Sequence, residues 1–246
     1  MKVCVILPTY NERGNIARLL SSLLGVFDGL KRFDMHVLVA DDHSPDGTGD
    51  VVLGFMEQHK NIHISAGEKQ GLGMAYIRGF KCAMDELGAD VVFQMDADFS
   101  HDPALIPRFL EEIEKGYDVV IGSRYVKGGD TPGWSFRRRV ISRCGNLFLR
   151  YVGGLYKVND CTTGFRAIRV SLLRQIDFGL LHTRGYAFLS TLLYELCAHG
   201  AKVKEIPMVF RDREFGETKL NQRDMVEFFF NSLRLRWRKS KRHLGR

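Results

Sequence analysis

Short runs of apolar residues alternate, along the first half of the chain, with longer segments whose apolar residues recur every three or four positions. The short runs predict β-strands, and the longer segments predict amphipathic helices. Strands are expected near residues 2–7, 36–40, 62–65, 91–95 and 118–123, and helices near 14–27, 49–59, 72–87 and 103–115. This alternation predicts an α/β fold with a mostly parallel sheet flanked by helices. A length of 246 residues, 45% of them hydrophobic, is ordinary for one such domain.

Two carboxylates one residue apart end the fourth predicted strand. Asp96 and Asp98 follow the apolar run 91–95 directly, and residues i and i+2 of an extended chain point to the same side. Carboxylate oxygens suit Mg²⁺ and Mn²⁺, and a hard cation held by one or two carboxylates completes its shell with substrate phosphates. The pair therefore predicts a divalent cation and a nucleotide diphosphate. The alternative is an exposed turn with two solvated acids.

Polar residues also follow the first two predicted strands. The segment 8–12 (PTYNE) ends the first strand, and Asp41 and Asp42 end the second. Ligands of open α/β sheets bind outside the carboxyl ends of the strands, so the three clusters are expected to share one crevice. There Tyr10 would provide a flat wall, and the two carboxylates would provide acceptors, for a base or ribose. Capping of the second predicted helix is the alternative role, for Asp46 above all.

Further motifs extend this set along the chain. In order, the set comprises residues 8–12 (PTYNE), 41–48 (DDHSPDGT), 71–73 (GLG), 96–103 (DADFSHDP), 122–125 (GSRY), Arg138, 163–166 (TGFR) and 216–219 (GETK). It resembles that of the family 2 glycosyltransferases and, within them, looks most like the dolichol-phosphate mannose synthases. The resemblance covers nearly the whole chain and implies a GT-A (Rossmann-like) fold.

The resemblance implies an inverting transfer of mannose from GDP-mannose to a polyprenyl phosphate such as dolichyl phosphate, with Mg²⁺ or Mn²⁺ as cofactor. Asp98 and Arg124 are then the catalytic candidates, and Asp96 and Asp98 are the candidate metal ligands. The donor is expected to contact Pro8, Tyr10, Glu12, Asp41, Asp42, Lys69, Asp96, Ala97, Asp98, Arg213 and Lys219. The acceptor phosphate is expected to bind Arg124, Arg138 and Ser142.

Chemical arguments favour a phosphate acceptor. An arginine fork binds phosphate oxygens bidentately and offsets the repulsion between a phosphate nucleophile and a nucleotide diphosphate. A phosphate monoester has a second pKa of about 6, so no general base has to remove a proton. The chain also lacks the Glu-Asp pair followed by x-x-Arg/Gln-Trp that relatives acting on hydroxyl groups carry. Two positions depart from the family pattern: Ser100 stands where a third metal position is often Gln, and residues 189–191 (LST) replace Gln-x-Glu.

The positive charge of the chain belongs to its last residues. The net charge is +7, and residues 232–246 account for all of it because they hold seven Lys or Arg and no acid. Apolar residues are interleaved with these cations, as they are in 134–150, which is typical of segments that lie on membrane surfaces. We therefore expect a catalytic domain, 1–220, and an amphipathic basic helix or tail, 221–246. Nucleic-acid binding and a solvated tail are the alternatives, and the neutral body argues against nucleic acid.

Several features bear on location. Five scattered cysteines without metal or redox spacing fit a reducing compartment. A strand that begins at residue 2 leaves no room for a signal peptide, and no apolar stretch approaches the roughly 20 residues that span a bilayer. We expect a peripheral protein on the cytoplasmic face of the ER or plasma membrane, held by its own tail or by a small membrane-anchoring subunit. Two other functions stay open: UDP-glucose-dependent transfer, and a non-catalytic nucleotide-sugar-binding subunit.

Overall fold

Seven strands form one sheet in the computed structural model, which describes residues 1–181, 186–212 and 229–237. The strands are β1 (Lys2–Thr9), β2 (Asp34–Asp41), β3 (Ile62–Ala66), β4 (Val91–Gln94), β5 (Val119–Ser123), β6 (Arg166–Arg169) and β7 (Val203–Pro207). Their order is β3-β2-β1-β4-β6-β5-β7. Only β6 runs antiparallel to its neighbours, β4 and β5. The predicted mostly parallel α/β sheet is confirmed, and all five strands expected from the pattern are present.

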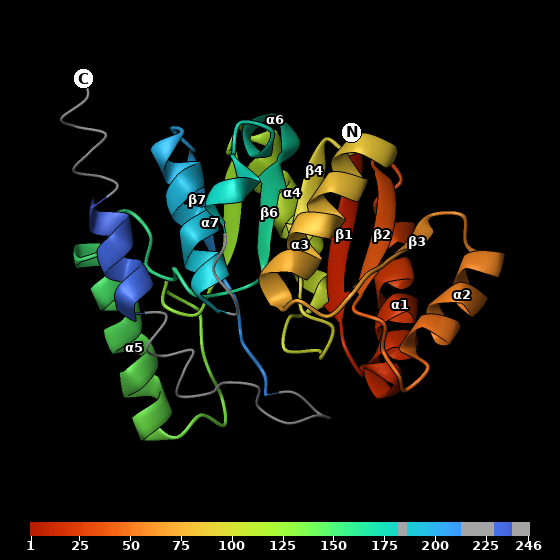
Figure 1. Cartoon of the computed structure of the whole chain (residues 1–246), viewed down its shortest axis with the longest axis horizontal. Helices are drawn as coiled ribbons and strands as arrows, with labels where there is room; N and C mark the ends of the chain where they lie inside the picture. Colours follow the sequence, from red (N-terminus) through yellow and green to blue (C-terminus); the bar gives the residue numbers. More distant parts are fainter. Residues whose placement is uncertain (182–185, 213–228, 238–246) are drawn as a thin grey trace.

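Helices cover both faces of the sheet (Figure 1). They are α1 (Arg13–Asp28), α2 (Thr48–Gln58), α3 (Leu72–Lys81), α4 (Ile106–Glu114), α5 (Phe136–Tyr151), α6 (Val170–Leu173) and α7 (Tyr186–Ala198). A π-helical turn, Cys82–Glu86, continues α3, and short 3₁₀ turns lie at Pro103–Leu105 and Phe178–Leu180. The four helices expected from the first half of the chain are α1 to α4. Helix α5 stands at one edge of the molecule in Figure 1.

The central strands are buried on both faces, which explains why they read as continuous apolar runs rather than as alternating ones. In β1, Cys4 and Ile6 belong to the core beneath α3 and α7, whereas Val5 and Leu7 belong to the core beneath α1 and α4. Helix α3 lies directly on β1, because a Cβ at Gly79 would come within 2.6 Å of the Ile6 side chain. This close packing fixes the position of α3 at the edge where the polar clusters emerge.

Residues 229–237 are helical and pack against the body of the protein. Leu235 is buried in the core shared with α7, and Asn231 Nδ2 donates to Thr191 Oγ1 at 2.8 Å. The ring of Phe229 stacks on Phe148 of α5, with 5.0 Å between centroids. The expected division at 220/221 falls outside the described residues and stays a prediction. Within the described ranges, no helix has the length and apolar character needed to cross a bilayer.

Candidate active site

The loops after β1 and β2 are joined by side-chain hydrogen bonds. Thr9 Oγ1 donates to Asp41 Oδ1 at 2.7 Å, and the Asp42 N–H donates to the Thr9 carbonyl at 3.0 Å. The Asp41 carboxylate also accepts bonds from the hydroxyl and the backbone N–H of Ser44. Asp41 is buried, and these hydrogen bonds show that its carboxylate orders the loop after β2.

Asp42 lies beside this anchor and pairs with an arginine from α3. Its Oδ1 is 2.9 Å from Arg78 Nη2, which also donates to the Asp41 carbonyl. Burial raises the pKa of Asp42, and the charge and hydrogen bond of Arg78 only partly offset that effect. The Lys69 ammonium lies 3.3 Å from the centre of the Tyr10 ring. The structure thus brings Tyr10 to the lysine that precedes the 71–73 motif.

Asp46 lies just before α2 and forms hydrogen bonds at the start of that helix. Its Oδ1 accepts bonds from the N–H and hydroxyl of Thr48, and its Oδ2 accepts the Arg13 N–H. The N-cap of α2 is Gly47, which has no side-chain capping hydrogen bond, and Asp46 binds the first helical residue from one position before that cap. Glu12 donates its N–H to Thr48 Oγ1, so the loop after β1 is held to the same helix start. Pro8 remains within β1, paired with Ala40 of β2.

The acidic loop after β4 is organised by His101. The Asp96 N–H donates to His101 Nδ1 at 3.0 Å, which leaves the ring proton of neutral His101 on Nε2, 3.9 Å from Asp96 Oδ2. The ring is 1% exposed and stacks on Phe165 with 5.0 Å between centroids. Burial lowers the pKa of His101, against the raising effect of the nearby carboxylates. Sequence reasoning gave this histidine no role, although it belongs to the 96–103 motif.

The donor atoms around this loop fit a hard divalent cation. The Asp96 side chain is 37% exposed, whereas Asp98 and Ala97 are buried, and Asp98 Oδ1 accepts the Ser100 N–H at 3.1 Å. Ser100 Oγ is buried, and no other described residue forms a hydrogen bond with it. The described residues contain no group of three ligating side chains. Mg²⁺ is typically held by one or two carboxylates, and substrate phosphates complete its coordination shell.

Two buried side chains lie behind the acidic loop. Tyr76 of α3 stacks on Phe188, and its pKa is raised, first by burial and then by the charge of Asp96. Arg166 of β6 is fully buried and donates to the carbonyls of Leu189 and Cys161. Burial lowers its pKa to about 10. Residues 189–191 are therefore part of the buried support, consistent with their lack of the Gln-x-Glu pattern.

Arg124, at the end of β5, forms a buried ion pair with Asp160. Its Nε and Nη2 each lie 2.7 Å from an Asp160 carboxylate oxygen, and Nη2 also donates to Thr162 Oγ1. The two side chains are 8% and 0% exposed. Burial by itself would raise the pKa of Asp160, but the charge and hydrogen bonds of Arg124 outweigh it and hold that pKa below its ordinary value. The sequence gave no signal for this pairing across 36 positions.

Aromatic rings connect Arg124 with the other expected acceptor residues. The Trp134 ring centre lies 5.4 Å from the Arg124 guanidinium and 4.0 Å from that of Arg138. Arg138 also pairs with Asp212 at 2.8 Å. Ser142 accepts the hydroxyl of Tyr125 at 2.6 Å, and the Tyr125 ring lies 5.5 Å from Arg124. Arg124, Arg138 and Ser142 are thus gathered around two aromatic rings.

The acidic loop and the arginine cluster meet through Phe210. This ring lies 5.6 Å from the Arg124 guanidinium and 6.0 Å from the centroid of His101, which binds Asp96. The predicted metal, donor and acceptor residues at the ends of β1, β2, β4 and β5 therefore line adjoining parts of one sheet edge. Arg213 and Lys219 lie outside the described residues.

Comparison with known proteins places this edge in context. The model of the family described as Glycosyl transferase family 2 matches residues 4–177. The chain is 38% identical, over the full length of both chains, to the undecaprenyl-phosphate mannosyltransferase of Micrococcus luteus. It is 36% identical to the polyprenol monophosphomannose synthase of Mycolicibacterium smegmatis, covering 93% of this chain and 84% of the relative.

Among solved structures, the protein resembles glucosyl-3-phosphoglycerate synthase from Mycobacterium tuberculosis in complex with Mn²⁺, UDP and glucosyl-3-phosphoglycerate. The TM-score is 0.68 at 19% identity, with 96% of this chain and 79% of the other covered. At that identity the likeness establishes the fold, which agrees with the expected GT-A architecture. The match to the family model and the two full-domain relatives go further: this chain belongs to glycosyl transferase family 2 and is a glycosyltransferase.

Proposed function

We propose that this glycosyltransferase transfers mannose from GDP-mannose to a polyprenyl phosphate and releases polyprenyl-phosphate mannose. The observation that carries the proposal is the contact chain from Asp96 through His101 and Phe210 to Arg124. It sets a carboxylate pair suited to a metal-bound diphosphate beside a cluster of cations suited to a second phosphate. The names of the two relatives agree with mannose as the transferred sugar and with a polyprenyl phosphate as the kind of acceptor.

The donor nucleotide would lie across the ends of β1 and β2. Tyr10, backed by Lys69 at 3.3 Å, offers a flat ring for the base, and buried Asp42 offers an acceptor held by Arg78. Asp96 and Asp98 would hold Mg²⁺ or Mn²⁺ against the diphosphate, and the cation would supply positive charge that stabilises the leaving GDP. Arg213 and Lys219 are proposed as further cations around that diphosphate.

The acceptor phosphate would bind at Arg124, Arg138 and Ser142. The ion pair with Asp160 fixes the guanidinium of Arg124 in place before the phosphate arrives. Binding the phosphate therefore costs little further side-chain entropy at Arg124. A phosphate with a second pKa of about 6 is largely ionised at neutral pH, so it attacks the sugar carbon without a general base. Direct attack from the face opposite GDP inverts the configuration at that carbon.

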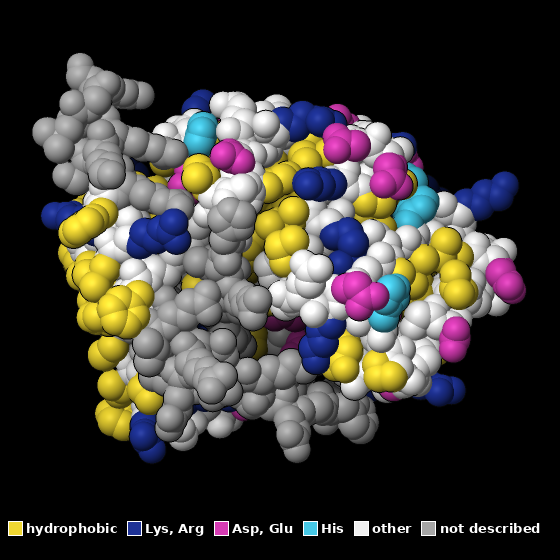
Figure 2. Space-filling view, in the orientation of Figure 1, with side chains coloured by type: hydrophobic (Ala, Val, Ile, Leu, Met, Phe, Trp, Pro, Cys, Tyr) yellow, Lys and Arg dark blue, Asp and Glu magenta, His cyan; other side chains and the backbone are white. Residues whose placement is uncertain are grey.

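A membrane-facing surface accompanies the acceptor cluster. Large apolar side chains are exposed on α5, on the loop after it and on 229–237: Phe136, Val140, Ile141, Leu147, Tyr151, Tyr156, Phe229, Phe230, Leu233 and Trp237. Phe136 is 83% exposed and Trp237 77%. Figure 2 shows hydrophobic side chains gathered along the edge of the molecule where α5 lies. This surface supports peripheral association with the membrane that holds a polyprenyl phosphate.

The test is transfer of label into lipid. The purified protein is incubated with Mg²⁺ and polyprenyl phosphate in vesicles, with labelled GDP-mannose and labelled UDP-glucose in separate reactions. Label entering the organic phase from GDP-mannose alone is the expected result. Label from UDP-glucose alone would replace the donor while retaining the acceptor. No transfer from either donor would contradict the proposal for the chain acting without an anchoring subunit.

A further inference from the structure

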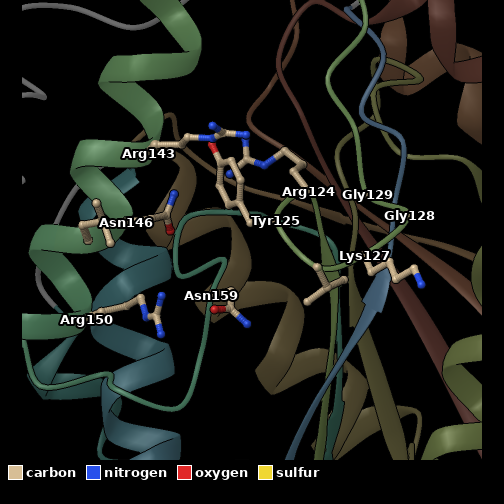
Figure 3. Close-up of a pocket in the computed structure, with 11 residues that line it drawn as sticks. Arg124, Tyr125, Lys127, Gly128, Gly129, Arg143, Asn146, Arg150 and Asn159 are labelled. Atoms are coloured by element: carbon tan, nitrogen blue, oxygen red, sulfur yellow. The ribbon is translucent and has the colours of Figure 1, made fainter.

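A pocket of about 450 Å³ opens between α5 and the loop that follows β5 (Figure 3). Its lining includes the backbone of residues 126–129, the side chains of Asn146 and Asn159, and four cations. These cations are Arg124, Lys127, Arg143 and Arg150. No carboxylate is among the described lining residues. The pocket is thus large enough for a small anionic group and is lined by one sign of charge.

Three of these cations have no carboxylate partner within the described part of the chain. Lys127, Arg143 and Arg150 form none of the ion pairs found there. The nearby acids are engaged elsewhere: Asp160 pairs with Arg124, and Glu205 accepts bonds from Asn159. The negative charges of Asp160 and Glu205 reduce the excess of positive charge at the pocket. Among the described residues, they leave these three cations without a direct counter-ion.

Arg150 carries a more specific signal. Among the described residues, its buried Nε has no hydrogen-bond partner, and its Nη2 makes only a 3.5 Å contact, with the Tyr156 carbonyl. A buried donor without an acceptor is costly, and in a native site it commonly indicates water or an anion that completes the bonding. Figure 3 shows the guanidinium groups of Arg124 and Arg143 pointing toward each other across Tyr125. An anion between these groups would offset their repulsion.

One acceptor phosphate does not account for the whole pocket. Arg143 and Arg150 are seven positions apart on α5, which places them about 10 Å apart along the helix. A phosphate held by Arg124, Arg138 and Ser142 would lie near the Arg143 end and leave the Arg150 end unmatched. The helix face between the two arginines carries Leu147, which lines the pocket and is 47% exposed. The anion that fits this pattern carries apolar chains.

We propose that this pocket binds the phosphodiester headgroup of an anionic membrane phospholipid at its Arg150 end, with the Arg150 guanidinium contacting the phosphate, Arg143 adding positive charge from the other end of the pocket, and Leu147 contacting the first part of the lipid chains. The proposal rests on the membrane association proposed above, but it is separate from catalysis. Tyr151 and Tyr156, which lie edge to face with 6.5 Å between centroids, would sit beside the headgroup, where tyrosines favour the interface. The lipid would thereby orient α5 and bring the acceptor site to the bilayer surface.

The test compares vesicles of phosphatidylcholine with vesicles that also contain phosphatidylglycerol, using co-sedimentation of the intact protein. The variant R143Q/R150Q removes two pocket cations. The control R137Q/R234Q removes two exposed cations from the same membrane-facing segments but outside the pocket. We expect R143Q/R150Q to bind phosphatidylglycerol vesicles about tenfold more weakly than the control does. Equal losses in the two variants would mean general charge attraction and would overturn the proposal.

Two further arms separate a headgroup from other phosphates. Inorganic phosphate, tested by its protection of the protein against thermal unfolding, should stabilise far less than dispersed short-chain phosphatidylglycerol; equal protection would overturn the assignment to lipid. Mannose transfer to farnesyl phosphate in detergent should survive in R143Q/R150Q, and a comparable loss there would make the pocket part of the acceptor site instead. Because vesicle binding needs no transfer, it can succeed or fail independently of the proposed mannosyl transfer.

Discussion

The backbone N–H of Asp96 donates to Nδ1 of His101, and the same ring turns its Nε2 toward the Asp96 carboxylate at 3.9 Å. One buried ring therefore contacts both ends of the residue proposed to hold the metal. Phe99, between the two, has a φ of +61°, a conformation that a bulky residue adopts only when its surroundings impose it. His101 is thus a positioning residue for the acidic loop.

Two substitutions of His101 should distinguish the hydrogen bond that its ring accepts from the Asp96 N–H from the other contacts of the ring. In H101N the amide oxygen can still accept the Asp96 N–H, whereas H101A leaves that donor unpaired. We expect H101A to lower kcat and Mn²⁺ affinity about 10- to 100-fold, the range typical of residues that orient metal ligands. H101N should recover most of the loss. Turnover and Mn²⁺ binding by electron paramagnetic resonance measure both effects, with H199A, just after the end of α7, as the control.

Equal losses in H101A and H101N would refute this account. The hydrogen bond to Asp96 would then contribute little, and the stacking of the imidazole on Phe165 would be the main role of His101.

Asp98→Ala should abolish transfer and leave the fold intact. The loss follows because one of two carboxylates proposed to bind the cation is removed, and charge stabilisation by a bound metal is worth several kcal/mol. D98N retains an oxygen that can accept the Ser100 N–H, but its transfer activity should still fall by at least about 100-fold. The matched control is D102N, since Asp102 caps the following 3₁₀ turn from the same loop. Full activity of D98N, measured by label transfer, would exclude Asp98 as a metal ligand.

Arg138→Gln should weaken binding of the acceptor phosphate rather than binding of the donor. Arg138 lies over Trp134 and beside Asp212, so its guanidinium is held where the acceptor phosphate is proposed to bind. Loss of a charge-assisted bond predicts an increase of about tenfold in the KM for polyprenyl phosphate, with little change in the KM for GDP-mannose. The neighbouring variant R137Q removes the same charge from an exposed position. Similar KM values for R137Q and R138Q would argue against a specific role.

The fold and the convergence of the strand ends were predictable because they depend on local patterns. Apolar runs of strand length identified β1 to β5, and the carboxyl ends of parallel strands necessarily gather at one edge. Strand β6, only four residues long, and its antiparallel pairing with β4 and β5 depend on contacts between distant segments. The same is true of the partners of Arg124 and Arg138. Asp160 and Asp212 lie 36 and 74 positions away, and no local motif links them to the arginines.

The buried pair of Arg124 and Asp160 predicts a specific dependence of stability on pH. D160N should destabilise the fold at neutral pH by about 3–5 kcal/mol, because it leaves the Arg124 charge buried without its partner. The folded pKa of Asp160 is held below the ordinary 3.8, so its stabilising contribution is complete above 3.8 and is lost as the pH falls through the lower folded value.

The difference in stability between wild type and D160N should therefore narrow as the pH falls below 3.8. Urea unfolding at neutral and acidic pH measures it. The control is D177N, because Asp177 is an exposed cap of the Phe178–Leu180 turn and pairs with no buried cation among the described residues. A difference between wild type and D160N that stays constant over this range would mean that Asp160 keeps an ordinary pKa. In that case the pair would position Arg124 for the acceptor phosphate without the charge stabilisation that its geometry indicates.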